Sequence, residues 1–244
     1  MLLEVRDVDT FYGDSQVLNG AAFAVAPGQQ VGILGRNGMG KTTLVHTIMG
    51  FLRPRQGEIL FDGHRISGSA PEKIARRGVT LVPQGRRVFG SLTVGETLQI
   101  AYRKRGAQPW TVKEVCERLP ILGDRWNQQA GLMSGGQRQM LALGRALVGN
   151  GQLVLMDEPS EGLDQHHLAM VVETVHELRR RGTAVVVVEQ KLRFVLDLVD
   201  SVHIMVRGQF VESFSSADVR GDPAPVLRAL GFTGRDAVAT IRPS

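Results

Sequence analysis

The chain has 244 residues, of which 43% are hydrophobic and 22% are charged, a composition typical of an ordinary globular protein. Its formal net charge is +5, and its single cysteine, Cys116, excludes an intrachain disulfide and any cysteine-based metal site. No apolar run approaches the roughly 18 residues of a membrane span. The charged N-terminus MLLEVRDVDT resembles an alternating strand rather than a signal peptide. We therefore expect a protein that starts and stays in the cytoplasm.

The excess of basic residues has two interpretations. The 29 Lys and Arg outnumber the 24 Asp and Glu, which is compatible with a nucleic-acid ligand. However, the clusters Arg103-Lys104-Arg105 and Arg179-Arg180-Arg181 are expected at helix C-termini, where cations complement the helix dipole. Few aromatic residues interleave these charges, so the pattern favours solvated helix ends over a nucleic-acid surface.

The first third of the chain predicts short antiparallel strands. Turn residues separate its apolar segments, and the pair Asp-Gly is the strongest of these hairpin signals. The expected elements are strands at 2–8 and 19–25, a turn at Pro27-Gly28, and a hairpin over 57–66 that turns at Asp62-Gly63.

From residue 79 onward, short apolar strands alternate with helices. The expected strands are VTLVPQ (79–84), LVLMDE (153–158), AVVVVEQ (184–190) and VHIMV (202–206). The expected helices are 94–104 behind a Thr93/Glu96 capping box, 112–119 behind Thr111/Glu114 and stopped by Pro120, and 135–148. We interpret these helices as a helical subdomain, about 86–150, inserted between two strands of one sheet. The whole chain, 1–244, is expected to form a single domain with a short C-terminal tail, about 213–244.

The strongest chemical motif is GRNGMGKT, Gly35 to Thr42, which fits the phosphate-loop pattern G-x-x-x-x-G-K-[ST]. It follows the strand QQVGIL and opens the helix KTTLVHTIM, which is the context that the motif requires. Its glycines allow successive backbone N–H groups to curl around an anion at the helix N-terminus. Lys41 would then reach the β- and γ-phosphates, and the Thr42 hydroxyl would reach Mg²⁺. The alternative is a glycine-rich turn with a surface lysine. It does not explain why the motif lies between a strand and a helix, as the phosphate-loop pattern requires.

Two adjacent carboxylates follow another buried strand. LVLMDE delivers Asp157 and Glu158 to the sheet edge where the phosphate loop is expected. Asp157 is placed to hold Mg²⁺ through its water shell, and Glu158 to orient and deprotonate an attacking water. Alone, such a pair is more often a solvated strand end. Together with the phosphate loop, it predicts a nucleotide hydrolase.

A third motif carries a family resemblance. MSGGQRQ, Met133 to Gln139, closely resembles the LSGGQ signature of ATP-binding cassette (ABC) ATPases, with Ser134 as a helix N-cap. The resemblance runs from about residue 3 to 212 and includes FYG, GRNGMGKT, the glutamine at 84 and SEGLD in the family's order. It implies an α/β fold: a P-loop NTPase core with a mainly parallel sheet, an N-terminal antiparallel β subdomain and an inserted α-helical subdomain.

The resemblance also implies site roles. Tyr12 matches the aromatic that stacks on adenine, Gln84 the glutamine that senses Mg²⁺ and the γ-phosphate, and Asp164 the aspartate that crosses a dimer interface. Catalytic roles fall on Glu158, Gln190 and Gln84, and Mg²⁺ contacts on Thr42, Gln84 and Asp157. The residues expected to contact ATP are Tyr12, Val17, Gly35, Arg36, Asn37, Gly38, Gly40, Lys41, Thr42, Thr43, Ser134, Gly135, Gly136, Gln137 and Asp164. Among them, the signature residues would contact the nucleotide held by the partner. A core-edge role for Tyr12 and a plain loop role for Asp164 are the structural alternatives.

The residue at position 190 departs from most of the family. Most cassette ATPases carry a switch histidine there, whereas this chain has Gln190 in VVVVEQKL. A glutamine can donate a hydrogen bond to a phosphate oxygen, but it cannot take a proton near neutral pH. Alternatively, Gln190 only caps the following helix, KLRFVLDLV. The sequence VEQ, together with PQGRRVFGSLTVGETL and EPSEGLDQHH, resembles one of the two ATPases of bacterial uptake systems for branched-chain and other hydrophobic amino acids, and their urea and amide relatives.

These resemblances predict an ATP-hydrolysing subunit of an ABC importer, peripheral on the cytoplasmic face of the membrane. Expected partners are a second ABC ATPase subunit, in a homo- or heterodimer, permease subunits and, indirectly, a solute-binding protein, but no nucleic acid. Contact with the permeases is expected at Arg86, Arg87, Val88, Phe89 and Leu92, unless Phe89 and Leu92 merely cover the helical subdomain. The alternatives are a soluble ABC ATPase unconnected with transport and a nucleotide-binding regulatory subunit with negligible turnover.

Overall fold

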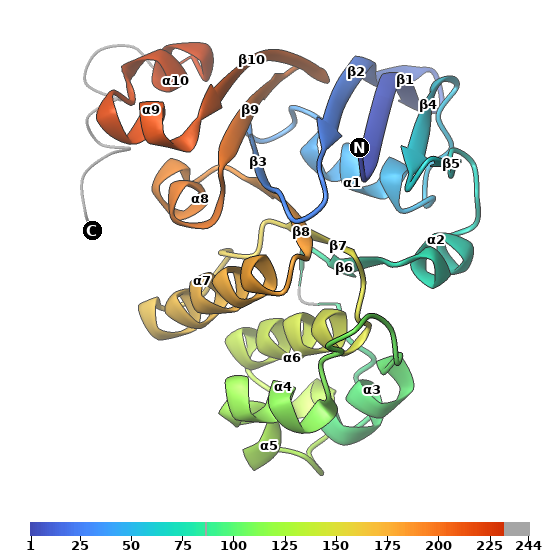
Figure 1. The fold of residues 1–244 in the computed structure, drawn as a ribbon, viewed down its shortest axis with the longest axis vertical. Coiled ribbons are helices and arrows are strands. Elements are labelled where there is room, and N and C mark those ends of the chain that lie inside the picture. The colour runs from blue at the N-terminus through green and yellow to red at the C-terminus, as the bar shows by residue number, and fades with distance from the viewer. Residues whose placement is uncertain (86, 232–244) are drawn as a thin grey trace.

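The computed structural model describes residues 1–85 and 87–231, which form two sheets and an inserted group of helices (Figure 1). The N-terminal sheet is antiparallel, as expected, with the strand order β2-β1-β4-β5. Its strands are β1 (Leu3–Tyr12), β2 (Ser15–Val25), β4 (Gln56–Phe61) and β5 (His64–Arg65). The first two are longer than predicted because their pairing continues through irregularities to Tyr12 and Ser15. The hairpin turns at Asp62-Gly63, as predicted, and both residues have positive φ.

The second sheet carries the chemistry-bearing motifs. Its strand order is β10-β9-β3-β8-β7-β6, with every neighbouring pair parallel except β9 and β10. The strands are β3 (Gln30–Leu34), β6 (Val79–Val82), β7 (Leu153–Asp157), β8 (Ala184–Glu189), β9 (Ser201–Val206) and β10 (Gln209–Ser215). Since β3, β7 and β8 are neighbours that run in one direction, their carboxyl ends meet at one edge of the sheet.

The four consecutive valines of β8 are explained by burial on both faces of this sheet. Val185 and Val187 belong to one core cluster, which includes residues of α6 (Gly135–Val148), α7 (Gln165–Arg180) and α8 (Leu192–Leu198). Val186 and Val188 belong to the other, with residues of α1 and the antiparallel sheet. The covering helices are α1 (Lys41–Ile48), α2 (Pro71–Arg77), α7 (Gln165–Arg180) and α8 (Leu192–Leu198).

The expected helical subdomain is present between β6 and β7 (Figure 1). It contains α3 (Val94–Ala101), α4 (Val112–Arg118), α5 (Pro120–Asp124), a short 3₁₀ helix (Ala130–Leu132) and α6 (Gly135–Val148). The capping boxes at Thr93 and Thr111 are both formed. Pro120 does more than stop α4, because it also begins α5, where its missing N–H costs nothing.

Two sequence expectations need correction. The cluster 103–105 lies beyond α3, which ends at Ala101, whereas Arg179 and Arg180 do lie in the last turn of α7. The chain from 213 to 231 is more than a short appended tail, because it completes β10 and forms α9 (Ser216–Gly221) and α10 (Ala224–Ala229). These helices pack because their apolar residues, Val219, Val226, Leu227 and Leu230, are buried. The rest of the expected tail, 232–244, lies outside the described residues. Within the described ranges, no helix is long and apolar enough to cross a membrane.

Candidate active site

The phosphate-loop motif occupies the connection between β3 and α1. Gly38 and Gly40 have φ of 78° and 99°, a left-handed conformation that side chains disfavour. A Cβ on Gly35 would lie 2.7 Å from the carbonyl oxygen of Met205, so a side chain there would clash with backbone. The loop therefore has the backbone freedom and the helix N-terminus that an anion cradle requires.

Lys41 is buried at the centre of this cradle. Its Nζ donates to the carbonyl oxygens of Gly35 at 2.9 Å and Arg36 at 3.2 Å. The same ammonium lies 3.2 Å from Oε1 of Glu158, forming an ion pair between the loop and the end of β7. A phosphate entering the loop would find this cation already positioned.

Three side-chain oxygens converge beside the lysine. The Thr42 hydroxyl donates to Oδ1 of Asp157 at 3.1 Å and lies 3.5 Å from Oε1 of Gln84. Burial raises the pKa of Asp157 to about 6, and the nearby Glu158 carboxylate adds to the rise, while the Thr42 hydrogen bond opposes it. Hydroxyl, amide and carboxylate oxygens are suitable ligands for Mg²⁺, which usually keeps several waters. The residues therefore fit the cation implied by the motif.

Glu158 is held by three partners at the end of its strand. In addition to Lys41, the amide nitrogen of Gln84 donates to its Oε2 and that of Gln190 to its Oε1, both at 3.1 Å. The alternative in which Gln190 only caps the next helix is wrong, because the N-cap of α8 is Lys191 and no side chain caps it. Gln190 instead contacts the carboxylate expected to act as the base.

Glu189 is a structural member of the site that the sequence interpretation left unassigned. Its buried carboxylate accepts from the backbone N–H of Ser160 at 3.1 Å, Gln190 at 2.7 Å and Lys191 at 3.2 Å. It thereby ties the turn after β7 to the turn after β8. The sequence did carry a signal for this role. Glu189 directly follows a run of buried valines, and a buried carboxylate needs several hydrogen-bond donors.

Several of the remaining predicted nucleotide contacts line a cavity at the loop. Gly35, Arg36, Asn37 and Gln190 line a cavity of about 320 Å³, together with Leu230 after α10. Leu230 had no sequence signal, because its place depends on the packing of the C-terminal helices. Val17 lies beside Gly40, with its carbonyl oxygen 3.2 Å from a Cβ placed there. Thr43 is buried in α1, and Tyr12, at the end of β1, is 49% exposed.

The signature motif forms a separate cradle at the start of α6. Ser134 is the N-cap, as predicted; it also forms a capping box with Gln137, and Gly135 and Gly136 begin the helix. Asp164 caps α7, accepting from the N–H of His167 at 2.9 Å, and the His167 ring lies close to Gly136. The capping bonds of the signature join Ser134 and Gln137 to each other at the start of α6, whereas Lys41 at the start of α1 bonds Gly35, Arg36 and Glu158. One chain therefore presents two separate cradles.

Comparison with known proteins decides the family. The family model of the ABC transporter matches residues 18–161, which include both cradles and the carboxylates. This chain belongs to the ABC transporter ATPases. It is 36% identical over 224 residues to the high-affinity branched-chain amino acid transport ATP-binding protein BraG of Pseudomonas aeruginosa, covering 91% of this chain and 96% of that protein. It is 28% identical to a probable branched-chain amino acid transport ATP-binding protein, LivG, of Archaeoglobus fulgidus, covering 94% and 95%.

Solved structures confirm the cassette fold. A nucleotide-free ATP-binding cassette from an ABC transporter superposes with a TM-score of 0.79 at 27% identity, covering 92% of this chain and 97% of the other. Other relatives carry the names of ribose import, Nod factor export and lipopolysaccharide export ATP-binding proteins, so membership of the ABC family does not define the cargo. The ABC ATPase assignment does establish the activity class, ATP binding and hydrolysis.

Proposed function

We propose that this ABC ATPase drives uptake of branched-chain or other hydrophobic amino acids through separate permease subunits. The observation that carries the proposal is the similarity to the branched-chain amino acid transport protein BraG over nearly the full length of both chains. The presence of Gln190 where most cassettes have a histidine points to the same group. An ATPase of a urea or amide importer is the alternative within transport.

The proposed roles follow from the contacts. Lys41 and the loop N–H groups hold the phosphates of ATP, and Thr42, Gln84 and Asp157 hold Mg²⁺, which when bound neutralises phosphate charge. Glu158 accepts a proton from the attacking water. Gln84 and Gln190 fix the Glu158 carboxylate through the two 3.1 Å bonds, one to each oxygen.

The separate signature cradle supports a dimer of cassettes. Ser134 to Gln137 would bind the nucleotide held by the other subunit's phosphate loop, with Asp164 at the interface and Tyr12 stacking on adenine. Each site is then incomplete without a second cassette, identical or different. We propose that residues 1–244 act as one domain in this assembly, peripheral on the cytoplasmic face of the membrane.

A groove beside Gln84 supports contact with the permeases. It measures about 460 Å³ and is lined by His46, Phe51, Leu81, Pro83, Arg87, Val88, Phe89 and Arg145. Phe89 is 66% exposed, which supports a contact surface at this residue, while Val88 and Leu92 are half-buried. Arg86, also expected at this surface, lies outside the described residues. An exposed aromatic side chain next to cations is suited to binding a partner segment that is apolar and has a polar end.

Co-purification tests the proposal. The tagged chain, extracted from membranes in detergent, should bring down permease chains and a second cassette. Phe89→Glu should abolish this co-purification, whereas Ile100→Glu should not. Ile100 is similarly exposed (62%), but it lies on α3 and does not line the groove. Proteoliposomes of the recovered complex should then take up leucine rather than urea when ATP is present. Recovery of only soluble partners would favour the ABC ATPase unconnected with transport.

A further inference from the structure

The two features of this chain that would face a partner's nucleotide lie at the starts of two neighbouring helices. Ser134 is the N-cap of α6 at the signature, and Asp164 is the N-cap of α7. The chain between these caps runs through α6 and β7, so no short segment sets their relative position. Their placement depends instead on side chains that join α6 to α7.

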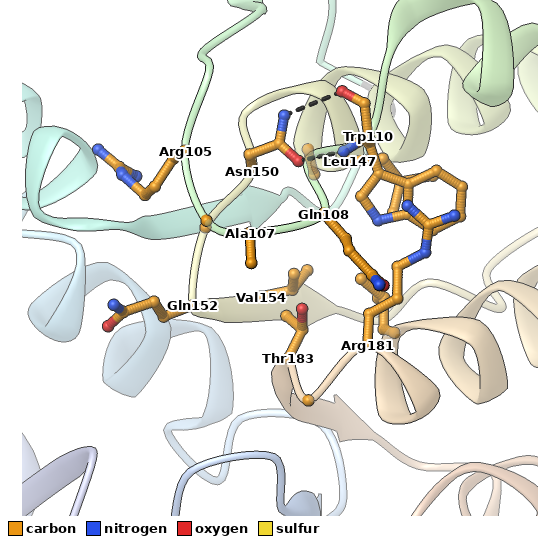
Figure 2. Close-up of a pocket in the computed structure, with 15 residues that line it drawn as sticks. Arg105, Ala107, Gln108, Trp110, Leu147, Asn150, Gln152, Val154, Arg181 and Thr183 are labelled. Atoms are coloured by element: carbon orange, nitrogen blue, oxygen red, sulfur yellow. Dashed lines mark hydrogen bonds between the residues drawn. The ribbon is translucent and has the colours of Figure 1, made fainter.

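The C-terminal ends of both helices are joined through Trp110. The side chain of Asn150, which follows the C-cap of α6, accepts from the backbone N–H of Trp110 at 2.6 Å and donates to its carbonyl oxygen at 3.0 Å (Figure 2). The guanidinium of Arg181, the C-cap of α7, lies 3.7 Å from the centre of the Trp110 ring. A second link at the N-terminal ends would therefore fix the two helices relative to each other.

His167, in the first turn of α7, contacts the Asp164 carboxylate twice. Its backbone N–H donates to Oδ1 at 2.9 Å, which is the ordinary capping bond. Its ring Nδ1 lies 2.9 Å from both carboxylate oxygens. These bonds, the backbone one first and the ring second, hold the pKa of Asp164 below its ordinary value. Because an ionised carboxylate only accepts hydrogen bonds, Nδ1 is the nitrogen that carries the proton.

The same ring lies against the first turn of α6. A Cβ placed on Gly136 would lie 3.4 Å from Cε1 and 3.5 Å from Nδ1 of His167, and its third nearest atom is Nε2 of that ring. The His167 side chain is only 19% exposed, whereas that of Asp164 is 65% exposed. The imidazole is thus held between two helices, and the carboxylate that it orients stays open to a partner.

His166 provides an internal comparison. Its ring meets that of His167 edge to face, with the ring centroids 5.7 Å apart. However, His166 is exposed, and the atoms closest to a Cβ on Gly136 are those of His167. The two histidines therefore share a helix turn and a chemistry but differ in contact with the signature helix.

We propose that His167 is a positioning residue for ATP hydrolysis, which fixes the Asp164 carboxylate against the signature helix so that both meet the partner's nucleotide together. This inference rests on the dimer of cassettes under the proposed function. Without the ring, Asp164 keeps its capping bond but loses the donor that directs its second oxygen. Since a misplacement of about 1 Å can cost roughly a hundredfold in rate, loss of one of two bonds is expected to cost about tenfold.

Spectra of the isolated chain test the linkage without the dimer. At a pH of about 8, where imidazoles are neutral, ¹H–¹⁵N spectra of the histidine rings should show the His167 proton on Nδ1, with the signal assigned by His167→Leu. Asp164→Ser keeps an N-cap oxygen but removes the second carboxylate oxygen. It should move the proton to Nε2 and shift the Gly136 amide signal, because the ring is released. Nε2 protonation in the parent, or an unmoved Gly136 signal in Asp164→Ser, would overturn the proposal.

Turnover tests the positioning role in the assembled dimer. His167→Leu keeps a side chain of similar bulk without the donor, and it should lower kcat about tenfold while the KM for ATP changes by less than about threefold. His167→Asn should recover most of this loss, because its side-chain nitrogen is as many bonds from Cα as Nδ1 is. His166→Leu should match the parent, and thermal unfolding of each variant controls for damage to the fold. A kcat of His167→Leu within about twofold of the parent would refute the role.

The side of the dimer that responds separates positioning from a general structural role. A copy carrying Lys41→Ala still offers its signature and Asp164, whereas a copy carrying Ser134→Arg still offers its phosphate loop. Each is paired with a second cassette, the same or a different chain, that supplies the missing part. Adding His167→Leu should lower turnover about tenfold in the first copy and by less than about twofold in the second.

The outcomes distinguish this inference from the proposed function. Equal losses in the two copies would overturn the positioning role while leaving the dimer intact. A parent that hydrolyses ATP at its full rate as a demonstrated monomer would contradict the dimer itself, and the positioning role with it.

Discussion

The side-chain nitrogen of Gln190 donates to Oε1 of Glu158 at 3.1 Å, joining the residue after β8 to the residue after β7. This bond holds the carboxylate on the side of the sheet where Lys41 and Gln84 also contact it. An amide that cannot exchange a proton near neutral pH therefore occupies a position where it can orient the proposed base. Its role is expected to be positional and electrostatic.

Replacing Gln190 tests that role. Gln190→Ala should lower single-turnover ATP hydrolysis by roughly tenfold to a thousandfold with little change in ATP affinity, as expected for loss of one aligned donor. Gln190→His should retain substantial activity but acquire a pH dependence near 6.5, which the parent lacks. Thermal unfolding of the same preparations controls for damage to the fold. Normal turnover per folded molecule in the alanine variant would contradict the catalytic role.

Glu158→Gln should bind ATP but scarcely hydrolyse it. The amide preserves the side-chain shape, but it cannot accept the proton of the attacking water, a loss that typically costs about 10² to 10⁴ in rate. Lys41 and the loop N–H groups remain to hold the phosphates, so binding of a labelled nucleotide should persist. Glu161→Gln is the matched control, since this carboxylate also accepts from Gln84, at 3.4 Å, but has no proposed proton-transfer role. Activity above about a third of the parent in Glu158→Gln would place the base elsewhere.

Catalysis should require two chains, because the cradles at Lys41 and Ser134 are separate within one chain. Lys41→Ala disables the phosphate loop, and Ser134→Arg blocks the signature cradle with a bulky cation. Each variant alone should be inactive. If the chain forms homodimers, a mixture of the two should recover part of the parent rate, because one of the two composite sites is then intact. If the mixture recovers no activity and the isolated parent is also slow, the partner cassette is a different chain.

Dilution completes this test. The parent rate per chain should fall as the protein is diluted through its dimer dissociation range, measured by light scattering on the same samples. A rate per chain that is independent of concentration in demonstrably monomeric protein would refute the two-chain requirement.

The raised pKa of Asp157 predicts a pH effect on the stability of the metal-free, nucleotide-free protein. Between its ordinary value of 3.8 and its folded value of about 6, the folded state binds more protons at this carboxyl than the unfolded state does. The free energy of unfolding should therefore fall as pH rises through this window, by at most about 3 kcal/mol from this group. Asp157→Asn should lack this contribution. Urea unfolding of both proteins from pH 4 to 7, in the presence of a chelator, gives the difference, and parallel curves would contradict the prediction.

The sequence by itself determined the elements and motifs whose signals are local. Gly38, Gly40 and Lys41 identify the phosphate loop because backbone freedom and charge are properties of the residues themselves. The Thr93 and Thr111 capping boxes appear as predicted because each is formed within four residues. The VVVV segment of β8 indicated a strand buried on both faces, since only a covered parallel strand is apolar at every position.

Only the tertiary structure decided the features that join distant parts of the chain. Gln190 could equally have capped α8 until the sheet register placed it against Glu158, 32 residues earlier. Glu189 gains one of its three donors, the Ser160 N–H, from the turn after a different strand, and Leu230 reaches the cavity beside the phosphate loop only because α9 and α10 pack. The backbone N–H of Trp110 likewise finds its acceptor in the side chain of Asn150, 40 residues away. Such contacts depend on strand order and side-chain packing, which nearby residues in the chain do not specify.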